Sequence, residues 1–156
     1  MTTTAPPTTA AAERTLCLLF QAGGERFAIR AADVQKVTPA GQRSQLPRLP
    51  AALLGITQHR GRVVTVVDAA AVLGAPGARV VGDANRLLLL ERPVRHLGLL
   101  VDAVDEIESL RLPTDLGQLP RGGIPTLRVA QQRGRAISLV DVAALVEQVT
   151  GLISGG

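Results

Sequence analysis

The sequence predicts an all-β protein made of two related units, each a small closed barrel of five strands, with short helices at the ends. Three observations lead to this fold class. A segment of about 70 residues occurs twice along the 156-residue chain. Each copy holds five short runs rich in β-branched residues or leucine, bounded by turn signals. No long helical period separates these runs, which argues against a sheet of alternating strands and helices and favours small barrels.

The internal repeat consists of three matches that occur in the same order in both copies. At offsets of 70 to 73 residues, they pair residues 16–20 with 87–91, 27–37 with 97–107, and 61–73 with 134–146. In the third match glycine, arginine and aspartate coincide, and Thr65 corresponds to Ser138. Order and spacing together indicate a duplicated unit.

Each copy follows the same local pattern along the chain. Two strands joined at a turn signal come first, then a third strand with spaced valine or isoleucine, a connection rich in proline and leucine, and a final hairpin with a Gly-Arg turn. In the first copy we expect the strands at residues 16–20, 26–30, 34–37, 55–59 and 62–67. In the second copy we expect them at residues 87–91, 96–101, 104–107, 127–131 and 135–140.

Each copy closes on an aspartate followed by an alanine-rich helical turn. Asp68 and Asp141 suit the N-cap of that turn, because a carboxylate accepts hydrogen bonds from the free backbone N–H groups there.

The domain boundaries follow from composition and from the repeat. We expect a disordered leader at residues 1–13, a folded domain at 14–149 and a flexible tail at 150–156. The first subdomain would span about 22–84 and the second about 85–149, with a strand at 14–21 pairing near their junction. The leader lacks the features of a secretory signal, and no apolar run reaches the length of a membrane span, so we expect a cytoplasmic protein.

The residue inventory argues against an enzyme and against a bound cofactor or metal. The single cysteine, Cys17, excludes an internal disulfide and sits between leucines, as a buried small hydrophobe would. His59 and His96, the two histidines, have no second histidine or cysteine at ligand spacing. Asp102, together with the other acidic residues up to Glu108, is best interpreted as a solvated strand face and turn.

The formal net charge of +4 raises the alternative of a basic barrel that binds nucleic acid. Lys36 is the single lysine among 17 basic residues, and the later arginines cluster at Arg121, Arg128, Arg133 and Arg135. Acidic residues are interspersed, however, and aromatic residues make up only 1% of the chain, which leaves few side chains for base stacking.

The order of three motifs resembles the CheW-like domain, the adaptor fold of bacterial chemotaxis systems. Residues 24–37 resemble the opening hairpin and third strand of that family. Residues 54–68 resemble its most specific motif, a Gly, then an Asn-Leu-Arg-Gly turn, then a strand that ends in Val-Asp. Residues 98–107 resemble its Gly-x-x-Val-Asp-x-Val stretch. The resemblance covers about residues 16–148, nearly all of the expected domain.

The resemblance implies two SH3-like barrels packed side by side and a non-enzymatic role as a scaffold. Family members couple the cytoplasmic tip of a methyl-accepting chemoreceptor to the regulatory domain of a CheA-type histidine kinase in a receptor array. By resemblance, the receptor lies near the groove between the barrels, and Val34 and Arg60 match positions associated with coupling. Val34 would offer an apolar contact or simply pack in the core. Arg60, with Gly61, would pair with a receptor carboxylate or brace its turn.

Two departures from the family pattern concern the expected contact surfaces. Gln58 and His59 stand where the family has Asn-Leu before Arg-Gly. Arg128 stands where the second copy usually has a glycine, at an edge the family uses against the kinase or neighbouring adaptors. A glycine there permits close approach of another backbone, whereas an arginine would block it. Two versions of the function therefore stay open: an adaptor for receptor and kinase, or an accessory protein that binds receptors or other CheW-like proteins but not the kinase.

Overall fold

The computed structural model describes residues 12–40, 52–75, 77, 82–91, 94–113 and 126–155. These residues form ten strands, a short 3-10 helix and two α-helices. The strands are β1 (Ala12–Ala22), β2 (Glu25–Arg30), β3 (Val34–Pro39), β4 (Leu53–His59), β5 (Arg62–Asp68), β6 (Arg86–Leu90), β7 (Leu97–Val101), β8 (Ala103–Pro113), β9 (Leu127–Gln132) and β10 (Arg135–Val140). The helices are η1 (Ala31–Asp33), α1 (Ala69–Val72) and α2 (Val142–Gly155). The prediction of an all-β fold of two five-stranded units is confirmed.

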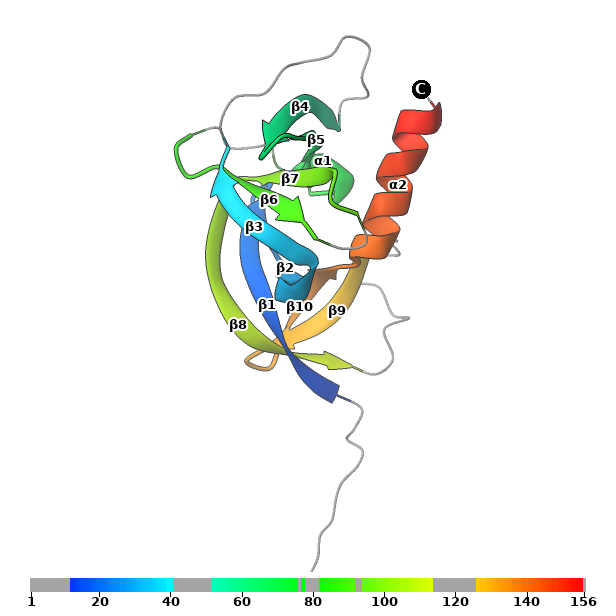
Figure 1. Ribbon diagram of the computed structural model, residues 1–156. Helices are drawn as coiled ribbons and strands as arrows, with labels where there is room; N and C mark the ends of the chain where they lie inside the picture. The colour runs from blue at the N-terminus through cyan, green and yellow to red at the C-terminus, as the bar shows by residue number, and fades with distance from the viewer. Residues whose placement is uncertain are drawn as a thin grey trace, which may run out of the picture.

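The ten strands form one closed barrel and one five-stranded sheet. The barrel has the order β1-β2-β10-β9-β8, and the second sheet has the order β3-β6-β7-β5-β4. Figure 1 shows the barrel in the lower half of the molecule, the second sheet above it and α2 along one side. Every strand expected from the sequence is present, and β1 and β8 are longer than expected, with 11 residues each.

Each sheet combines the first hairpin of one copy of the repeat with the last three strands of the other copy. The barrel combines β1 and β2 of the first copy with β8, β9 and β10 of the second, while the second sheet combines β6 and β7 of the second copy with β3, β4 and β5 of the first. The sheets therefore divide the chain differently from the boundaries at about 22–84 and 85–149. The physical reason is that strands pair with partners far away along the chain, and a repeat in the sequence does not show which strands will pair.

The exchange is visible in two equivalent parallel pairings. β2 pairs with β10 through Phe27↔Ser138 and Ala28↔Leu139. In the second sheet, β7 pairs with β5 from Thr65↔Leu97 to Asp68↔Leu100. In both cases the second strand of one copy joins the last strand of the other, so the two sheets repeat the same strand order.

Three clusters of buried apolar side chains hold the fold together. One cluster fills the barrel and includes Cys17, Leu19 and Leu139. A second lies within the other sheet and includes Val64, Leu87 and Leu89. The largest contains residues from both sheets and from α1 and α2, among them the stacked rings of Phe20 and Phe27. This shared core joins the two sheets into one unit, since burying apolar surface between them stabilises both.

The turn between β1 and β2 is tied to the start of β8 by Asp102. The Gly23 N–H donates a hydrogen bond to Oδ2 of Asp102 at 3.0 Å, and the Asn85 side chain donates to the Asp102 carbonyl at 3.1 Å. Asp102 is buried. The expectation of a solvated acidic face was therefore wrong for this residue: its carboxylate is kept inside because it accepts a backbone N–H that water does not reach.

Both helices begin at the aspartates predicted as N-caps. The Asp68 carboxylate accepts from Ala70 N–H at 3.1 Å, and the Asp141 carboxylate accepts from Ala144 N–H at 3.1 Å. α2 extends to Gly155, so most of the expected flexible tail is helical. The reason is an apolar stripe that includes Leu145 and Val149, which α2 buries against the shared core. The expected leader lies mostly outside the described residues.

The two sheets differ in the pairing of their outermost strands. In the barrel, β8 reaches β9 and Arg111 pairs with Gln131. In the second sheet β3 and β4 hold the equivalent places, and no pairing joins them among the described residues. β3 has 6 residues and ends at Pro39, whereas the equivalent β8 has 11. The space between the outer edges of β3 and β4 is called the seam below.

Candidate functional site

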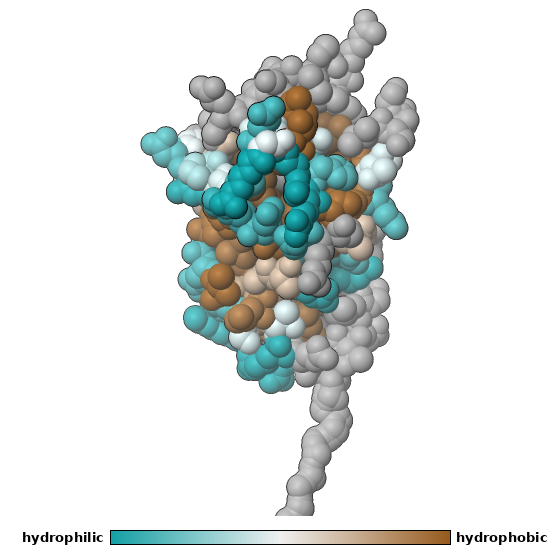
Figure 2. Space-filling view, viewed as in Figure 1, coloured by the Kyte–Doolittle hydropathy of each residue, from teal (hydrophilic) through white to brown (hydrophobic). Residues whose placement is uncertain are grey.

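An apolar groove lies where the barrel meets β3 and η1. It encloses about 220 Å³, and its lining residues are Leu18, Ala31, Val34, Gln35, Lys36, Val37 and Ile107. Leu18 of β1 is the direct cross-strand neighbour of Ile107 on β8. Figure 2 shows hydrophobic side chains gathered on the face that carries β3 in Figure 1, with hydrophilic ones around them.

Several apolar side chains at or near this groove are open to solvent. Ile107 is 59% exposed, Leu16 is 60% exposed and Val37 is 36% exposed. Ile107 stands between Glu106 and Glu108, so it interrupts an otherwise acidic stretch. Exposed apolar side chains that gather beside a groove are typical of a surface that binds a partner.

Local irregularity in β3 brings its two valines to the same groove. The register of β3 against β6 shifts between Val34 and Lys36, which marks a bulge. In a regular strand two residues three positions apart would face opposite sides, and a bulge removes that alternation. Val34 and Val37 therefore both line the groove, and Val34 also packs against the shared core.

The groove contains equivalent residues from the two copies of the repeat. Val37 and Ile107 correspond at the offset of 70 residues and lie on the equivalent strands β3 and β8. The groove thus lies where the third strands of the two copies come together. Both residues are among the spaced apolar positions expected of a third strand, and neither was predicted to belong to a site. An isolated isoleucine within an acidic strand was the signal that could have revealed it.

The Gly-Arg turn between β4 and β5 lies apart from the lining of this groove. Arg60 has a φ of 51° and Gly61 a φ of 79°, so both adopt the left-handed conformation of a tight hairpin turn. The Arg60 side chain is exposed and makes no hydrogen bond or ion pair with another described residue. The bracing bonds that were one expectation for Arg60 are thus not seen among the described residues.

The other two residues predicted near this turn line a second cavity. Gln58 and His59 border a space of about 230 Å³ at the seam, together with Thr38, Pro39, Ala40, Thr57, Leu87 and Leu89. The structure therefore separates the predicted contact residues into three places: Val34 in the apolar groove, Gln58 and His59 at the seam, and Arg60 with Gly61 at the hairpin tip.

Arg128 lies in a regular part of the barrel. It pairs with Leu139 within the β9–β10 ladder, and the barrel is closed around it. Its guanidinium forms an ion pair with Asp141 at 3.1 Å and donates a hydrogen bond to the Leu127 carbonyl. The matching position in the first copy is Gly55, where φ is 137° and the register shifts. The second copy has no such shift in register, so an arginine fits there.

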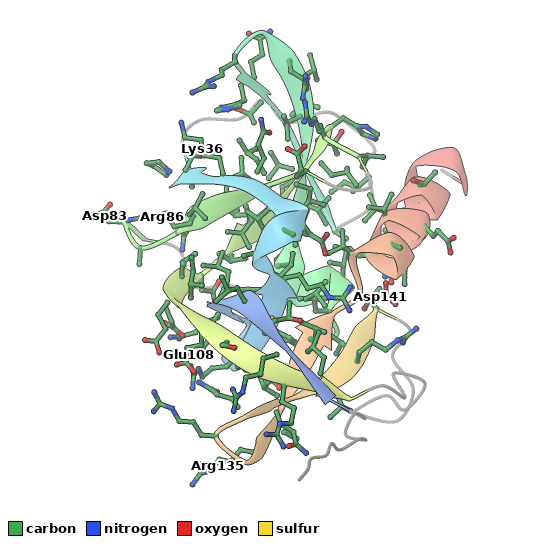
Figure 3. The ribbon with its side chains drawn as sticks, turned by 60° about the horizontal axis from the view of Figure 1, so that its bottom comes forward. Lys36, Asp83, Arg86, Glu108, Arg135 and Asp141 are labelled. Carbon is green, nitrogen blue, oxygen red and sulfur yellow. The ribbon has the colours of Figure 1, made fainter. Side chains whose placement is uncertain are left out.

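A mixed cluster of charges covers the far end of the barrel. Arg26, Gln132, Arg133 and Arg135 line a polar cleft there. Arg26 forms an ion pair with Asp105, and Arg133 forms one with Glu108. Hydrogen bonding between Glu106 and Glu108 raises the pKa of Glu106, and the bonds that Glu108 shares with Glu106 and Gln132 lower its own pKa. In Figure 3, Glu108 and Arg135 both lie in the lower half of the view. Arg121 of the predicted arginine cluster lies outside the described residues.

The described residues offer neither a metal-binding group nor an exposed thiol. No group of three or more His, Cys, Asp or Glu side chains is placed to hold a metal ion in the described ranges. Cys17 is fully buried, and desolvation raises the pKa of its thiol from 9.0 to about 11, which keeps it in the unreactive protonated form at neutral pH. Within the described part of the chain, none of the helices has the length and hydrophobicity needed to span a membrane.

Comparison with known proteins gives one consistent match. The model of the CheW-like domain matches residues 16–150 of this chain. The chain is 31% identical over 135 residues to protein FrzA of Myxococcus xanthus, with 82% of each chain covered. It is 32% identical over 92 residues to a probable chemotaxis protein CheW of Rhizobium etli, with 58% of this chain and 57% of that protein covered.

A solved structure shares the fold. The scaffolding protein TtCheW from Thermoanaerobacter tengcongensis superposes with a TM-score of 0.67 at 22% sequence identity. The superposition covers 82% of this chain and 89% of that chain.

Proposed function

The chain belongs to the family of CheW-like domains, and on that premise we propose that it is a chemotaxis scaffold rather than an enzyme. It couples methyl-accepting chemoreceptors to a CheA-type histidine kinase within a receptor array in the cytoplasm. Its mechanism is binding and geometry, and it forms or breaks no covalent bond. The family match and the relatives named for chemotaxis support this proposal.

The observation that carries the receptor part of the proposal is the apolar groove. Val37 and Ile107 expose apolar surface there from two strands whose other exposed side chains are mostly polar. An amphipathic helix of a receptor tip would bury its apolar stripe against such a surface. Lys36 lines the same groove and offers a cation to an acidic residue beside that stripe.

The hairpin tip supplies the second receptor contact in this proposal. Arg60 is exposed and makes no bond with another described residue, so its guanidinium is available to a carboxylate. A planar guanidinium binds a carboxylate through two parallel hydrogen bonds, which adds orientation as well as affinity. Gly61 holds the turn that presents it.

Kinase coupling is supported by the way that Arg128 is accommodated. Its side chain reaches Asp141, and the β9–β10 ladder continues regularly through it. The arginine therefore does not distort the barrel surface on which kinase docking is proposed. The accessory version, which binds receptors or other CheW-like proteins but no kinase, is the alternative.

The nucleic-acid alternative is weakened by the charges at the barrel end. Arg26 and Arg133 are already paired with Asp105 and Glu108, so the arginine cluster carries its own counter-charges. Binding to phosphates would need those carboxylates to move away from the arginines, or would face their repulsion.

Co-elution of purified components tests the proposal. The full chain is mixed with a receptor tip fragment and, separately, with the regulatory domain of a CheA-type kinase. We expect a complex with each. A complex with the receptor fragment alone would select the accessory version, and no complex with either would overturn the scaffold proposal. DNA binding that survives physiological salt would support the nucleic-acid alternative instead.

A matched pair of variants assigns the receptor contact to the groove. Ile107→Ser removes an exposed apolar side chain from the groove, and Val63→Ser does the same on β5, where Val63 is 50% exposed. We expect Ile107→Ser to weaken receptor binding by about tenfold or more, as loss of a central contact does. Val63→Ser should leave the affinity unchanged. Equal affinity of the two variants would show that the receptor binds elsewhere.

A further inference from the structure

We propose that the receptor surface continues from the apolar groove along the outer wall of the barrel and ends at two arginines, Arg14 of β1 and Arg111 of β8. This pair binds an acidic residue of the same helix whose apolar stripe fills the groove. The inference rests on the proposed receptor binding. It adds a second contact, which fixes the direction in which the bound helix lies.

The outer wall is the face of β1 and β8 that points away from the barrel interior. It consists of three successive cross-strand pairs, which are Leu18↔Ile107, Leu16↔Ser109 and Arg14↔Arg111. The intervening pair Thr15↔Leu110 points inward, since Leu110 belongs to the barrel core and side chains alternate along a strand. In Figure 1 the start of β1 and the end of β8 lie at the lower end of the barrel, away from the second sheet. The outer wall therefore runs from the groove to the arginines.

Leu16 extends the apolar surface beyond the groove. Its side chain is 60% exposed, about as much as the 59% of Ile107. Leu16 and Ile107 are diagonal neighbours on the same face of the ladder, where side chains are about 7–8 Å apart. A helix lying over both would remove from water apolar surface that the groove alone leaves exposed.

Arg14 and Arg111 place two like charges directly opposite each other in the ladder. Such a pair destabilises a sheet. Both side chains are exposed, and neither guanidinium forms an ion pair with a carboxylate of a described residue. Arg14 donates a hydrogen bond to the Ser109 carbonyl at 3.4 Å, which turns it towards the groove. A carboxylate placed between the two guanidiniums would relieve their repulsion and accept hydrogen bonds from both.

The nearby glutamates of β8 belong to a different surface. Glu108 lies opposite Cys17, whose side chain is in the barrel core, so Glu108 points to the interior side of the strand. There its carboxylate contacts Gln132 and Arg133. Alternation along β8 thus separates the acidic side chain of Glu108 from the basic one of Arg111. The outer wall is left with a positive charge at its far end, which complements an acidic residue.

The spacing along β8 predicts where the acidic residue of the partner lies. Arg111 follows Ile107 by four residues, which is about 13 Å along a strand. A helix parallel to the strand rises about 1.5 Å per residue, so positions about seven or eight residues apart cover most of that distance and share one face. The fitting partner is therefore an amphipathic helix with an acidic residue about two turns from the apolar residue that contacts Ile107.

Binding of a receptor tip fragment to the full chain tests this inference. The native chain is compared with the double variant Arg14→Gln/Arg111→Gln, which removes both charges and keeps polar side chains. We expect the double variant to bind about fivefold more weakly at low salt, as for loss of an exposed ion pair. The difference should shrink as the salt concentration rises. Arg133→Gln/Arg135→Gln, at the polar cleft, removes the same charge and should bind as the native chain does.

A double-mutant cycle assigns the contact to one residue of the partner. Each acidic residue of the receptor fragment is replaced in turn by its amide. We expect one replacement to weaken binding to the native chain and to have no further effect on binding to Arg14→Gln/Arg111→Gln. The melting temperature of this variant should not fall below that of the native chain, because the repulsion between the two arginines is removed.

Four outcomes would contradict the inference. If Arg14→Gln/Arg111→Gln binds with native affinity while Ile107→Ser binds more weakly, the inference is wrong and the receptor proposal stands. An equal loss in the control double variant would assign the effect to net charge. Self-association that Arg14→Gln/Arg111→Gln abolishes would make a second copy of the chain the occupant. Absence of binding by the native chain would overturn the receptor proposal, and this inference with it.

Discussion

Arg128 and Asp141 link the last hairpin to the last helix. The Arg128 guanidinium lies 3.1 Å from the Asp141 carboxylate, which at the same time caps α2 through Ala144 N–H. One carboxylate thereby positions both β9 and α2. Arg128, which departs from the family pattern, thus helps to position α2 against the shared core through its ion pair with Asp141.

Removing the Arg128 side chain should weaken the contact between β9 and α2. Both side chains are 26% exposed, so the pair is partly screened, and we expect Arg128→Ala to lower the free energy of unfolding by about 0.5–1 kcal/mol. Faster hydrogen exchange at Ala144 and Leu145 should accompany the loss. Arg135→Ala, at an exposed position on β10, is the control and should change neither quantity. Unchanged exchange in α2 would show that Asp141 caps the helix without help from Arg128.

Substitution of Arg60 by glycine should weaken receptor binding without lowering the stability of the fold. Arg60 and Arg133 occupy equivalent turns with φ values of 51° and 52°, a conformation that glycine adopts at lower cost. We expect Arg60→Gly and Arg133→Gly to raise the free energy of unfolding by a similar amount, up to about 1 kcal/mol. Only Arg60→Gly should weaken binding to a receptor tip fragment, measured by titration calorimetry. Equal effects of both variants on binding would argue against a specific role for Arg60.

Gly98 should be sensitive to a single methyl group. A Cβ atom at Gly98 would lie 2.9 Å from Cδ1 of Leu87 and 3.3 Å from Cγ1 of Val64, inside the core of the second sheet. We expect Gly98→Ala to lower the free energy of unfolding by about 1–3 kcal/mol through overpacking, as measured by urea denaturation.

The matched control for Gly98 lies in α2. A Cβ atom at Gly151 would meet nothing within 4 Å. Gly151→Ala should therefore raise the free energy of unfolding by about 0.5–1 kcal/mol, because alanine favours the helix. A loss of stability in both variants would point to a general intolerance of substitution rather than to crowding at Gly98.

Cys17 should be inert in the folded protein. Burial raises the pKa of its thiol from 9.0 to about 11, so the unfolded chain loses this proton at a lower pH than the folded chain. The stabilisation from keeping the thiol neutral is complete below pH 9 and is lost as the pH rises from 9 towards 11. The free energy of unfolding should fall across this range more in the native chain than in Cys17→Ala.

Thiol labelling provides the second measurement on Cys17. At pH 8 a maleimide should modify the native protein only as fast as it unfolds, and should modify the denatured chain at once. Fast modification under native conditions would show that Cys17 is more accessible than its complete burial indicates.

Much of the local structure follows from short-range patterns in the sequence. Alternating and β-branched runs located the strands, glycine residues located the turns at Gly23 and Gly61, and the two N-cap aspartates located the helices. The candidate site was predicted less completely. Val34 was predicted either to contact a partner or to pack in the core, and it both lines the groove and packs against the shared core; Leu18 and Ile107, which also line the groove, were not predicted as site residues.

The sequence by itself determined the duplication, the strands and the turns, because these depend on residues close to one another along the chain. Only the tertiary structure decided that the two copies exchange their first hairpins, since strand pairing depends on partners such as β2 and β10 that are more than 100 residues apart. The packing of the two sheets brings Val37 of β3 and Ile107 of β8 to the same groove. That groove is made by side chains that meet only when the two sheets pack together.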